Sequence, residues 1–287
     1  MTTRKAAWLL VLIALLLFVP ASLVEARGKG PAPGLASGGD SPKVCSLATL
    51  EGAYGFFEQG TYVGKIGQFP PGPFPVAIAG SISYDGAGNL SGTYTGSFGG
   101  YIASASFTGT YLVDPDCTYS DEFSPGPGLV LHTAGSISGE GMFQEIHYVG
   151  TDAGIVMSGT SRKTRPEGCS LDTLKGDYAL FGEGTVSPQL FTLPSFRVAR
   201  SGLISFDGAG NFSGELTASA NGLIVPNVTF TGTYTVESDC TTTAEIHNSL
   251  GQTAHEFGAI SGNAALQEVH LVVTDPLWVF EEVAKRQ

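Results

Sequence analysis

Two short stretches place a glutamate and a histidine two residues apart. Residues 144–149 read QEIHYV, and residues 267–272 read QEVHLV, 123 positions later. A carboxylate beside an imidazole can orient the ring and raise its pKa for general acid–base chemistry. The same side chains are ligands that zinc and iron accept. The recurrence indicates either a duplicated chemical site or a duplicated scaffold.

A further histidine precedes the first of these stretches. If Ser138 and Gly139 form a two-residue hairpin, His132 lies opposite Glu145. His147 then falls on the same face, because side chains alternate along a strand. This register predicts two imidazoles and a carboxylate together on one face.

The second copy offers the same set, with His255 expected opposite Glu268 and His270 two residues along. Cross-strand His–Glu pairs are also ordinary sheet stabilisers, each contributing roughly 0.2–1 kcal/mol. We therefore assign no catalytic residue, no metal site and no cofactor. The six residues remain candidates for acid–base or metal chemistry, and a duplicated scaffold is the first expectation.

The whole chain beyond residue 44 is duplicated. The offset between matching residues stays between 122 and 124 from the first cysteine to the end. The matched pairs are CSLATLEGAYGFFEQGT with CSLDTLKGDYALFGEGT, GSISYDGAGNLSG with GLISFDGAGNFSG, FTGTYLVDPDCT with FTGTYTVESDCT, and GSISGEGMFQEIHYVGTD with GAISGNAALQEVHLVVTD.

Each copy contains eight segments of alternating polarity separated by turn residues. Eight sequential strands in about 120 residues, without a helix between them, are typical of a closed up-and-down β-barrel. The fold class is therefore all-β, with two tandem antiparallel eight-stranded barrels and β-sandwiches as the runner-up. In the first copy the segments lie near residues 53–63, 76–84, 89–96, 103–113, 117–123, 129–137, 140–149 and 154–162.

The N-terminal segment predicts export. Arg4 and Lys5 precede an apolar run from Ala6 to Val19, and the segment ends in Val24-Glu25-Ala26, with small residues at a cleavage spacing. This is typical of a secretory signal peptide, and the apolar run is too short for a membrane span. Residues 1–26 are read as the signal peptide, 27–44 as a disordered leader, 45–166 as the first barrel and 167–287 as the second. We expect a secreted or periplasmic protein with no membrane insertion after cleavage.

The four cysteines fit this compartment. Cys45 and Cys169 precede the first strand of each copy, and Cys117 and Cys240 begin the fifth. Disulfides persist in exported proteins, and pairing within each copy would let each barrel fold and be cross-linked independently of the other. The simplest prediction is Cys45–Cys117 and Cys169–Cys240, with pairing between the copies as the alternative.

Charge and motifs exclude several functions. The net charge of −12 repels phosphate backbones, so nucleic acid is not an expected partner. Nucleotide-binding glycine loops and the common hydrolase signatures are absent from the sequence. The repeated DGAGN turn offers oxygens to calcium, but Asp and Asn are expected in hairpin turns without a metal. A protein partner cannot be named from the residues.

Inward-facing aromatic residues suggest an apolar interior in each copy. Aromatic walls with glycines that leave space line ligand pockets, although such residues also simply fill small barrels. The longer, divergent links between strands 1–2, 3–4 and 5–6 predict a mouth at that end, ringed by Phe69, Phe74, Phe98 and Tyr101 in the first copy and by Phe191, Phe196 and Leu223 in the second. The expected ligand-lining residues are Tyr54, Phe57, Phe107, Tyr111, Tyr178, Phe181, Phe230 and Tyr234.

The pattern FTGTYxVxxDCT downstream of DGAGN resembles a group of exported bacterial tandem β-barrel proteins of uncharacterised role. Their barrels are likened to the allene oxide cyclase barrel. The resemblance implies the fold and carries no functional residue to a position here. We therefore expect a non-catalytic binding or interaction module for a small apolar molecule. The alternatives are a cyclase- or isomerase-like enzyme using the His/Glu set and a purely structural exported protein.

Overall fold

A computed structural model describes residues 44–65, 71–126, 128–186, 195–263 and 265–287. The predictions for the signal peptide and for residues 27–43 of the leader fall outside these ranges, as do Phe69 and Phe191. Within them, almost all regular structure is β-strand, with three short 3₁₀ turns. No helix there is long and apolar enough to cross a membrane.

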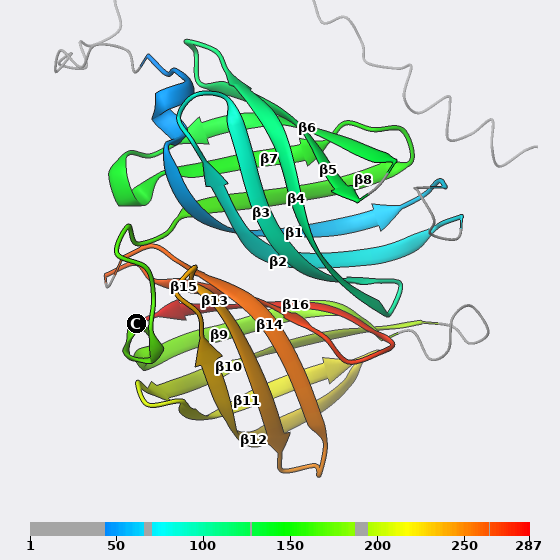
Figure 1. The fold of residues 1–287 in the computed structure, drawn as a ribbon. Helices are drawn as coiled ribbons and strands as arrows, with labels where there is room; N and C mark the ends of the chain where they lie inside the picture. The colour runs from blue at the N-terminus through cyan, green and yellow to red at the C-terminus, as the bar shows by residue number, and fades with distance from the viewer. Residues whose placement is uncertain (1–43, 66–70, 127, 187–194, 264) are drawn as a thin grey trace, which may run out of the picture. The chain divides into compact units, whose positions relative to one another are not determined.

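The strands form two closed antiparallel barrels of eight strands each, which confirms the predicted fold (Figure 1). Each strand pairs with the next in sequence, and the last pairs with the first. The first barrel consists of β1 (Gly52–Tyr62), β2 (Phe74–Tyr84), β3 (Asn89–Phe98), β4 (Tyr101–Val113), β5 (Thr118–Gly126), β6 (Leu129–Ser138), β7 (Glu145–Gly150) and β8 (Ile155–Lys163). The second consists of β9 (Lys175–Val186), β10 (Phe196–Asp207), β11 (Asn211–Ala220), β12 (Leu223–Val236), β13 (Thr241–Asn248), β14 (Thr253–Ser261), β15 (Glu268–Val273) and β16 (Trp278–Arg286).

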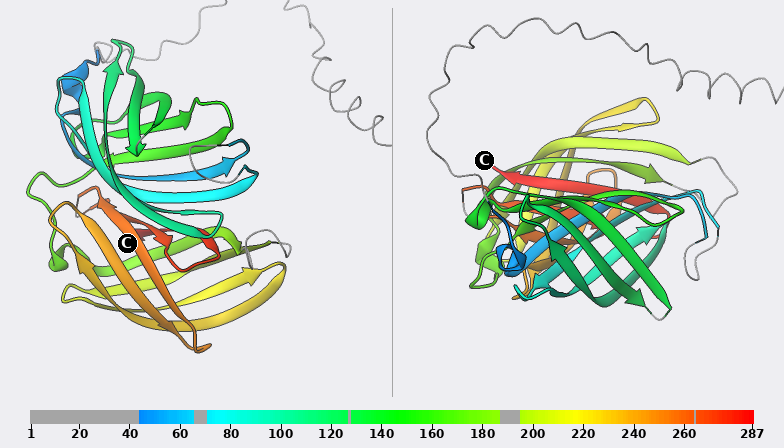
Figure 2. Two further views of the ribbon diagram at one scale, coloured as in Figure 1. Left: turned by 45° about the vertical axis from the view of Figure 1, so that its right-hand side comes forward. Right: turned by 90° about the horizontal axis from the view of Figure 1, so that it is seen from above.

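Closure leaves neither barrel with an unpaired sheet edge. β1 pairs with β8 from Tyr54 opposite Lys163 to Tyr62 opposite Ile155. β9 pairs with β16 in the same way, with Tyr178 opposite Arg286. In the two further views of Figure 2 the strands of each barrel curve around its interior. Side chains on alternate residues therefore point into a shared core or out of it.

The tight DGAGN turns hold themselves together. The Asp85 carboxylate accepts hydrogen bonds from the backbone N–H of Ala87 at 2.7 Å and of Asn89 at 2.9 Å, and from the Asn89 side chain at 2.6 Å. Asp207 repeats the arrangement in the second barrel. Both carboxylate oxygens accept hydrogen bonds from within the turn, so the requirements of the hairpin explain the motif.

Both predicted disulfides are present. Cys45 pairs with Cys117 and Cys169 with Cys240, with Cα–Cα distances of 5.0 and 4.9 Å. Closing a loop of 72 residues stabilises the fold by about 4 kcal/mol in the chain-entropy treatment. Two such bonds are typical of proteins in an oxidising compartment.

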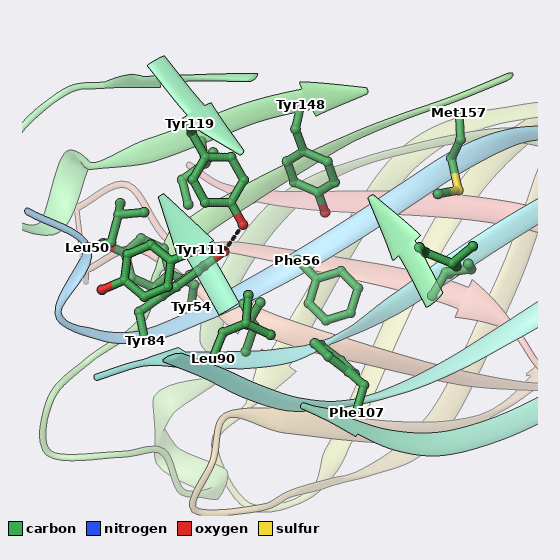
Figure 3. Close-up of a cluster of buried hydrophobic side chains, with 14 of the residues drawn as sticks. Leu50, Tyr54, Phe56, Tyr84, Leu90, Phe107, Tyr111, Tyr119, Tyr148 and Met157 are labelled. Atoms are coloured by element: carbon green, nitrogen blue, oxygen red, sulfur yellow. Dashed lines mark hydrogen bonds between the residues drawn. The ribbon is translucent and has the colours of Figure 1, made fainter. Parts of the chain in front are cut away.

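One end of each barrel is closed by the 3₁₀ turn that precedes its first strand. η1 (Leu47–Leu50) places Leu50 in the interior, and the Tyr111 hydroxyl donates to the Leu47 carbonyl at 2.9 Å. Tyr54 donates to Gln144 at 2.7 Å beside it. In Figure 3, Leu50, Tyr54 and Tyr111 gather at this end. The second barrel repeats the floor with Leu174, Tyr178, Tyr234 and Gln267.

Candidate functional site

The register between β6 and β7 differs from the predicted one. A 3₁₀ turn (Gly141–Phe143) lengthens the connection, so Ser138 rather than His132 lies opposite Glu145. The pairing is displaced by six residues. The predicted cross-strand set of His132, Glu145 and His147 is therefore wrong.

These three side chains lie on the outer surface of the first barrel. The His132 ring contacts Asp152 at 2.8 Å and Glu122 at 3.3 Å, and the hydrogen bond with Asp152 raises its pKa. His147 contacts Glu145 at 3.1 Å and is 53% exposed. The alternation of β7 explains the outcome, because Ile146 fills the interior.

The second copy has the same register shift but a different environment. Ser261, not His255, lies opposite Glu268, and His255 contacts Asp275 at 2.8 Å on the surface. His270 is buried instead, and its ring stacks on Phe57 of the first barrel with centroids 4.1 Å apart. Burial lowers the pKa of His270, although the nearby Glu268 opposes that shift.

Arg162 links the two copies of the motif. Its guanidinium contacts Glu145 and also reaches Glu268 at 2.7 Å. Burial alone would raise the pKa of Glu268, but hydrogen bonds from His270 and Lys285 and the charge of Arg162 bring it to about 2. Among the described residues, no group of three or more His, Cys, Asp and Glu side chains is arranged to hold a metal ion. The duplicated pair therefore belongs to contacts on the outside of the barrels.

The predicted ligand-lining aromatics divide into three groups. Tyr54, Tyr111 and Tyr178 are buried in the floors. Phe57 and Phe181 point outward, which corrects the prediction: each lies an odd number of residues from the inward tyrosine of its strand. The remaining three line the interior cavities, and the last of them also belongs to the floor of the second barrel: Phe107, Phe230 and Tyr234.

The mouth predictions are met in part. Phe98 is buried and lines the first cavity, and Phe74 is buried in the same core, whereas Tyr101 is 61% exposed. In the second barrel Phe196 packs beside the cavity-lining Val198, and Leu223 is exposed.

The first barrel contains buried carboxyl groups that sequence reasoning overlooked. Glu58 lies inside, and the Tyr148 hydroxyl donates to it at 3.0 Å. Burial raises the pKa of Glu58 to about 7, with the Tyr148 bond opposing the shift. A carboxyl group with that pKa can both give and take a proton near neutrality.

A second polar network lies across the same interior. Asp121 accepts hydrogen bonds from the hydroxyls of Tyr119 and Thr133, the latter at 2.7 Å, and burial raises its pKa. Tyr119 in turn shares a hydrogen bond of 3.0 Å with Tyr84 (Figure 3). Aromatic side chains fill most of the remaining space, and the cavity between them is about 50 Å³.

The second barrel has a different set of charges. The Arg200 guanidinium contacts Glu256 at 2.6 Å and also Glu282, and its carbon lies 4.6 Å from the centre of the Phe280 ring. Burial and the neighbouring Glu282 raise the pKa of Glu256 well above its usual range, against the effect of Arg200. Burial would lower the pKa of Arg200, but the two carboxylates raise it. We call Arg200, Glu256 and Glu282 the triad.

The triad borders a cavity of about 120 Å³. Its wall is mainly aliphatic and aromatic, and it extends from Leu174 at the floor to Leu250 at the tip of the β13–β14 hairpin. Other lining residues include Phe206, Phe230, Ala244, Ile246, Leu271 and Trp278. This cavity, with one charged cluster in an apolar wall, is the best candidate site.

The polar groups of the two interiors occupy different positions. Where the first barrel has Glu58, Asp121 and Tyr148, the second has Gly182, Ala244 and Leu271. Where the second has the triad, the first has Ile78, Thr133 and Gly159. These polar groups could have been found from the sequence by marking the inward-facing positions of each strand and comparing them between the two repeats.

Comparison of the chain with models of protein families and with curated proteins gave no match.

Proposed function

We propose that the protein is an exported, non-catalytic binding module whose second barrel holds a small, mainly apolar ligand. The cavity of about 120 Å³ carries this proposal. Ligand sites are concave and largely apolar, with a few convergent polar groups. An engineered apolar cavity of about 150 Å³ binds benzene. The cavity here is slightly smaller and of the same order, so it suits a single compact ring or a short branched chain.

Export is supported by two independent features. The N-terminal charges followed by an apolar run resemble a signal peptide, and the two disulfides fit an oxidising compartment. We propose that the protein acts after secretion or in a periplasm. N-terminal sequencing of the exported protein should begin at Arg27, and an intact N-terminus at Met1 would contradict export by cleavage.

Native mass spectrometry of the exported protein tests the binding function. We expect an additional organic mass that is lost on denaturation. Ala244→Phe places a ring in the cavity, whereas Thr243→Phe places the same ring on the outer face of the same strand. The extra mass should disappear from Ala244→Phe and persist in Thr243→Phe. A bare mass from the wild-type protein, unchanged after incubation with mixed lipids and small aromatics, would favour filled, structural barrels.

Glu58 favours a second candidate function, proton transfer in the first barrel. Its pKa of about 7 and its contact with Tyr148 suit general acid–base catalysis of an isomerisation or cyclisation. The resemblance to the allene oxide cyclase barrel agrees with this class of reaction. Turnover of an unsaturated epoxide that is lost in Glu58→Gln and kept in Glu145→Gln would support it. Equal turnover by both variants would exclude Glu58 as the acid or base.

A further inference from the structure

We propose that the ligand of the second barrel carries one cationic amine, which binds against Glu256 and Glu282. This inference rests on the proposed function, because it assigns the polar end of the ligand that the cavity holds. The apolar wall would accept the body of the ligand, and the triad would accept its charged end.

The cavity wall has more acidic than basic groups. Two carboxyl groups, Glu256 and Glu282, share one guanidinium, and Arg200 is the only basic side chain among the described residues that line the cavity. All three side chains are largely buried, so water screens their interactions poorly. A carboxylate ligand would compete with Glu256 and Glu282 for one guanidinium, whereas an ammonium group gives Glu256 a cationic partner of its own.

The triad is not part of the repeated scaffold. The matching residues of the first barrel, Ile78, Thr133 and Gly159, carry no charge, and that barrel is nevertheless closed with the same floor. Burying three charged groups costs free energy that apolar residues of similar size would not. A function specific to the second barrel accounts for their presence.

Binding of an amine should change the number of protons that the site holds. Without a ligand, the raised pKa of Glu256 favours its neutral form, beside the ion pair of Arg200 with Glu282. When an ammonium group enters, Glu256 releases its proton to solvent, and the amine keeps its own. Net charge in the site is unchanged, and one proton is released for each ligand bound. Affinity should therefore rise with pH until Glu256 is ionised in the empty site, and fall above the pKa of the amine.

Three probes with one aromatic body and different end groups test this inference: benzylamine, benzyl alcohol and benzoate. Trp278 lines the cavity and reports binding through its fluorescence, with Trp278→Phe as the blank. Calorimetry in buffers of different ionisation enthalpy counts the protons released. We expect benzylamine to bind at least roughly tenfold more tightly than benzyl alcohol, with benzoate weakest, because charge-assisted hydrogen bonds are about twice as strong as neutral ones.

Glu256→Gln removes the carboxyl group that would pair with the ammonium and keeps nearly the same shape. It should weaken benzylamine roughly tenfold or more and leave benzyl alcohol unchanged, which also shows that the variant is folded. Glu245→Gln removes the same charge from the outer surface of the neighbouring strand and should change neither. If none of the probes binds the wild-type protein, the proposed ligand function fails. If benzyl alcohol or benzoate binds best, or benzylamine releases no proton, the amine inference is overturned and the binding function stands.

Discussion

The two barrels share their frame and differ in what they enclose. The floors match residue by residue: Leu50, Tyr54 and Tyr111 have the counterparts Leu174, Tyr178 and Tyr234, and each barrel keeps its disulfide. The cavity walls do not match. The first interior pairs its carboxyl groups with tyrosine and threonine hydroxyls, and the second pairs them with an arginine. Duplication therefore preserved the frame while each interior acquired its own chemistry.

One carboxyl group shows how this divergence fits the same space. Glu58 on β1 lies opposite Gly159 on β8, and Glu282 on β16 lies opposite Gly182 on β9. A side chain at Gly159 would meet the Tyr148 ring at 2.5 Å, and one at Gly182 would meet the Glu282 side chain at 2.5 Å. The carboxylate has changed strands within one cross-strand pair, and in each barrel the glycine leaves room for the neighbouring side chain.

The largest effect should come from Arg200→Ile, which installs the residue of the first barrel. Removing one partner of a buried ion pair costs about 3–5 kcal/mol, because the remaining charge has no partner. The triple variant Arg200→Ile, Glu256→Thr, Glu282→Gly should recover most of this loss in thermal unfolding. It should also lose ligand binding. A triple variant as unstable as Arg200→Ile would mean that the two interiors are not interchangeable.

Glu58 predicts a pH dependence that belongs to the first barrel alone. Its pKa rises from 4.5 to about 7 on folding, so the folded state holds a proton that the unfolded state releases between these values. The contribution of Glu58 is therefore fully present below pH 4.5 and is lost as pH rises towards 7. The loss is of the order of 3 kcal/mol.

The matched measurement is the difference in unfolding free energy between wild type and Glu58→Gln across this pH range. Subtracting the two free energies cancels the contributions of Glu256 and Glu281, whose pKa values are also raised. What remains is the contribution of Glu58, together with its electrostatic coupling to Asp121. A difference that stays constant from pH 4.5 to 7 would show that Glu58 is not buried in a proton-holding state.

Phe57 and Phe181 allow the outer surfaces of the two barrels to be compared. They occupy matching positions, but Phe57 stacks on His270 and Phe181 is 53% exposed. Phe57→Ala should lower the unfolding free energy by about 1.5–3 kcal/mol, and Phe181→Ala by no more than about 0.5 kcal/mol. Chemical denaturation of the full chain measures both, and equal losses would contradict the stacking contact.

The sequence predicts the frame better than the site. Repeats and alternation reveal the barrels, and cysteine positions reveal the disulfides. The register of β6 with β7 could not be predicted, because Gly141–Phe143 form a 3₁₀ turn where a two-residue hairpin was expected. Arg200 and Glu256 lie on different strands, and only the closed barrel brings them together. Charged residues at inward-facing strand positions could have indicated the triad from the sequence. The repeated His–Glu pairs were examined instead, and they lie on outward-facing positions.

The two histidines of the repeated motif should differ in their contributions to stability. His147 is exposed, so His147→Ala should change stability by less than about 0.5 kcal/mol. His270→Ala should cost about 0.5–1.5 kcal/mol beyond lost burial, through the stack on Phe57.

Because the pKa of His270 is lowered on folding, its contribution is present above pH 6.5 and is lost as pH falls through the lowered value. Thermal unfolding of both variants at pH 5 and 8 would show this loss for wild type and His147→Ala only. The same loss in His270→Ala would assign the pH dependence to another group, and the motif would then have equivalent roles in both copies.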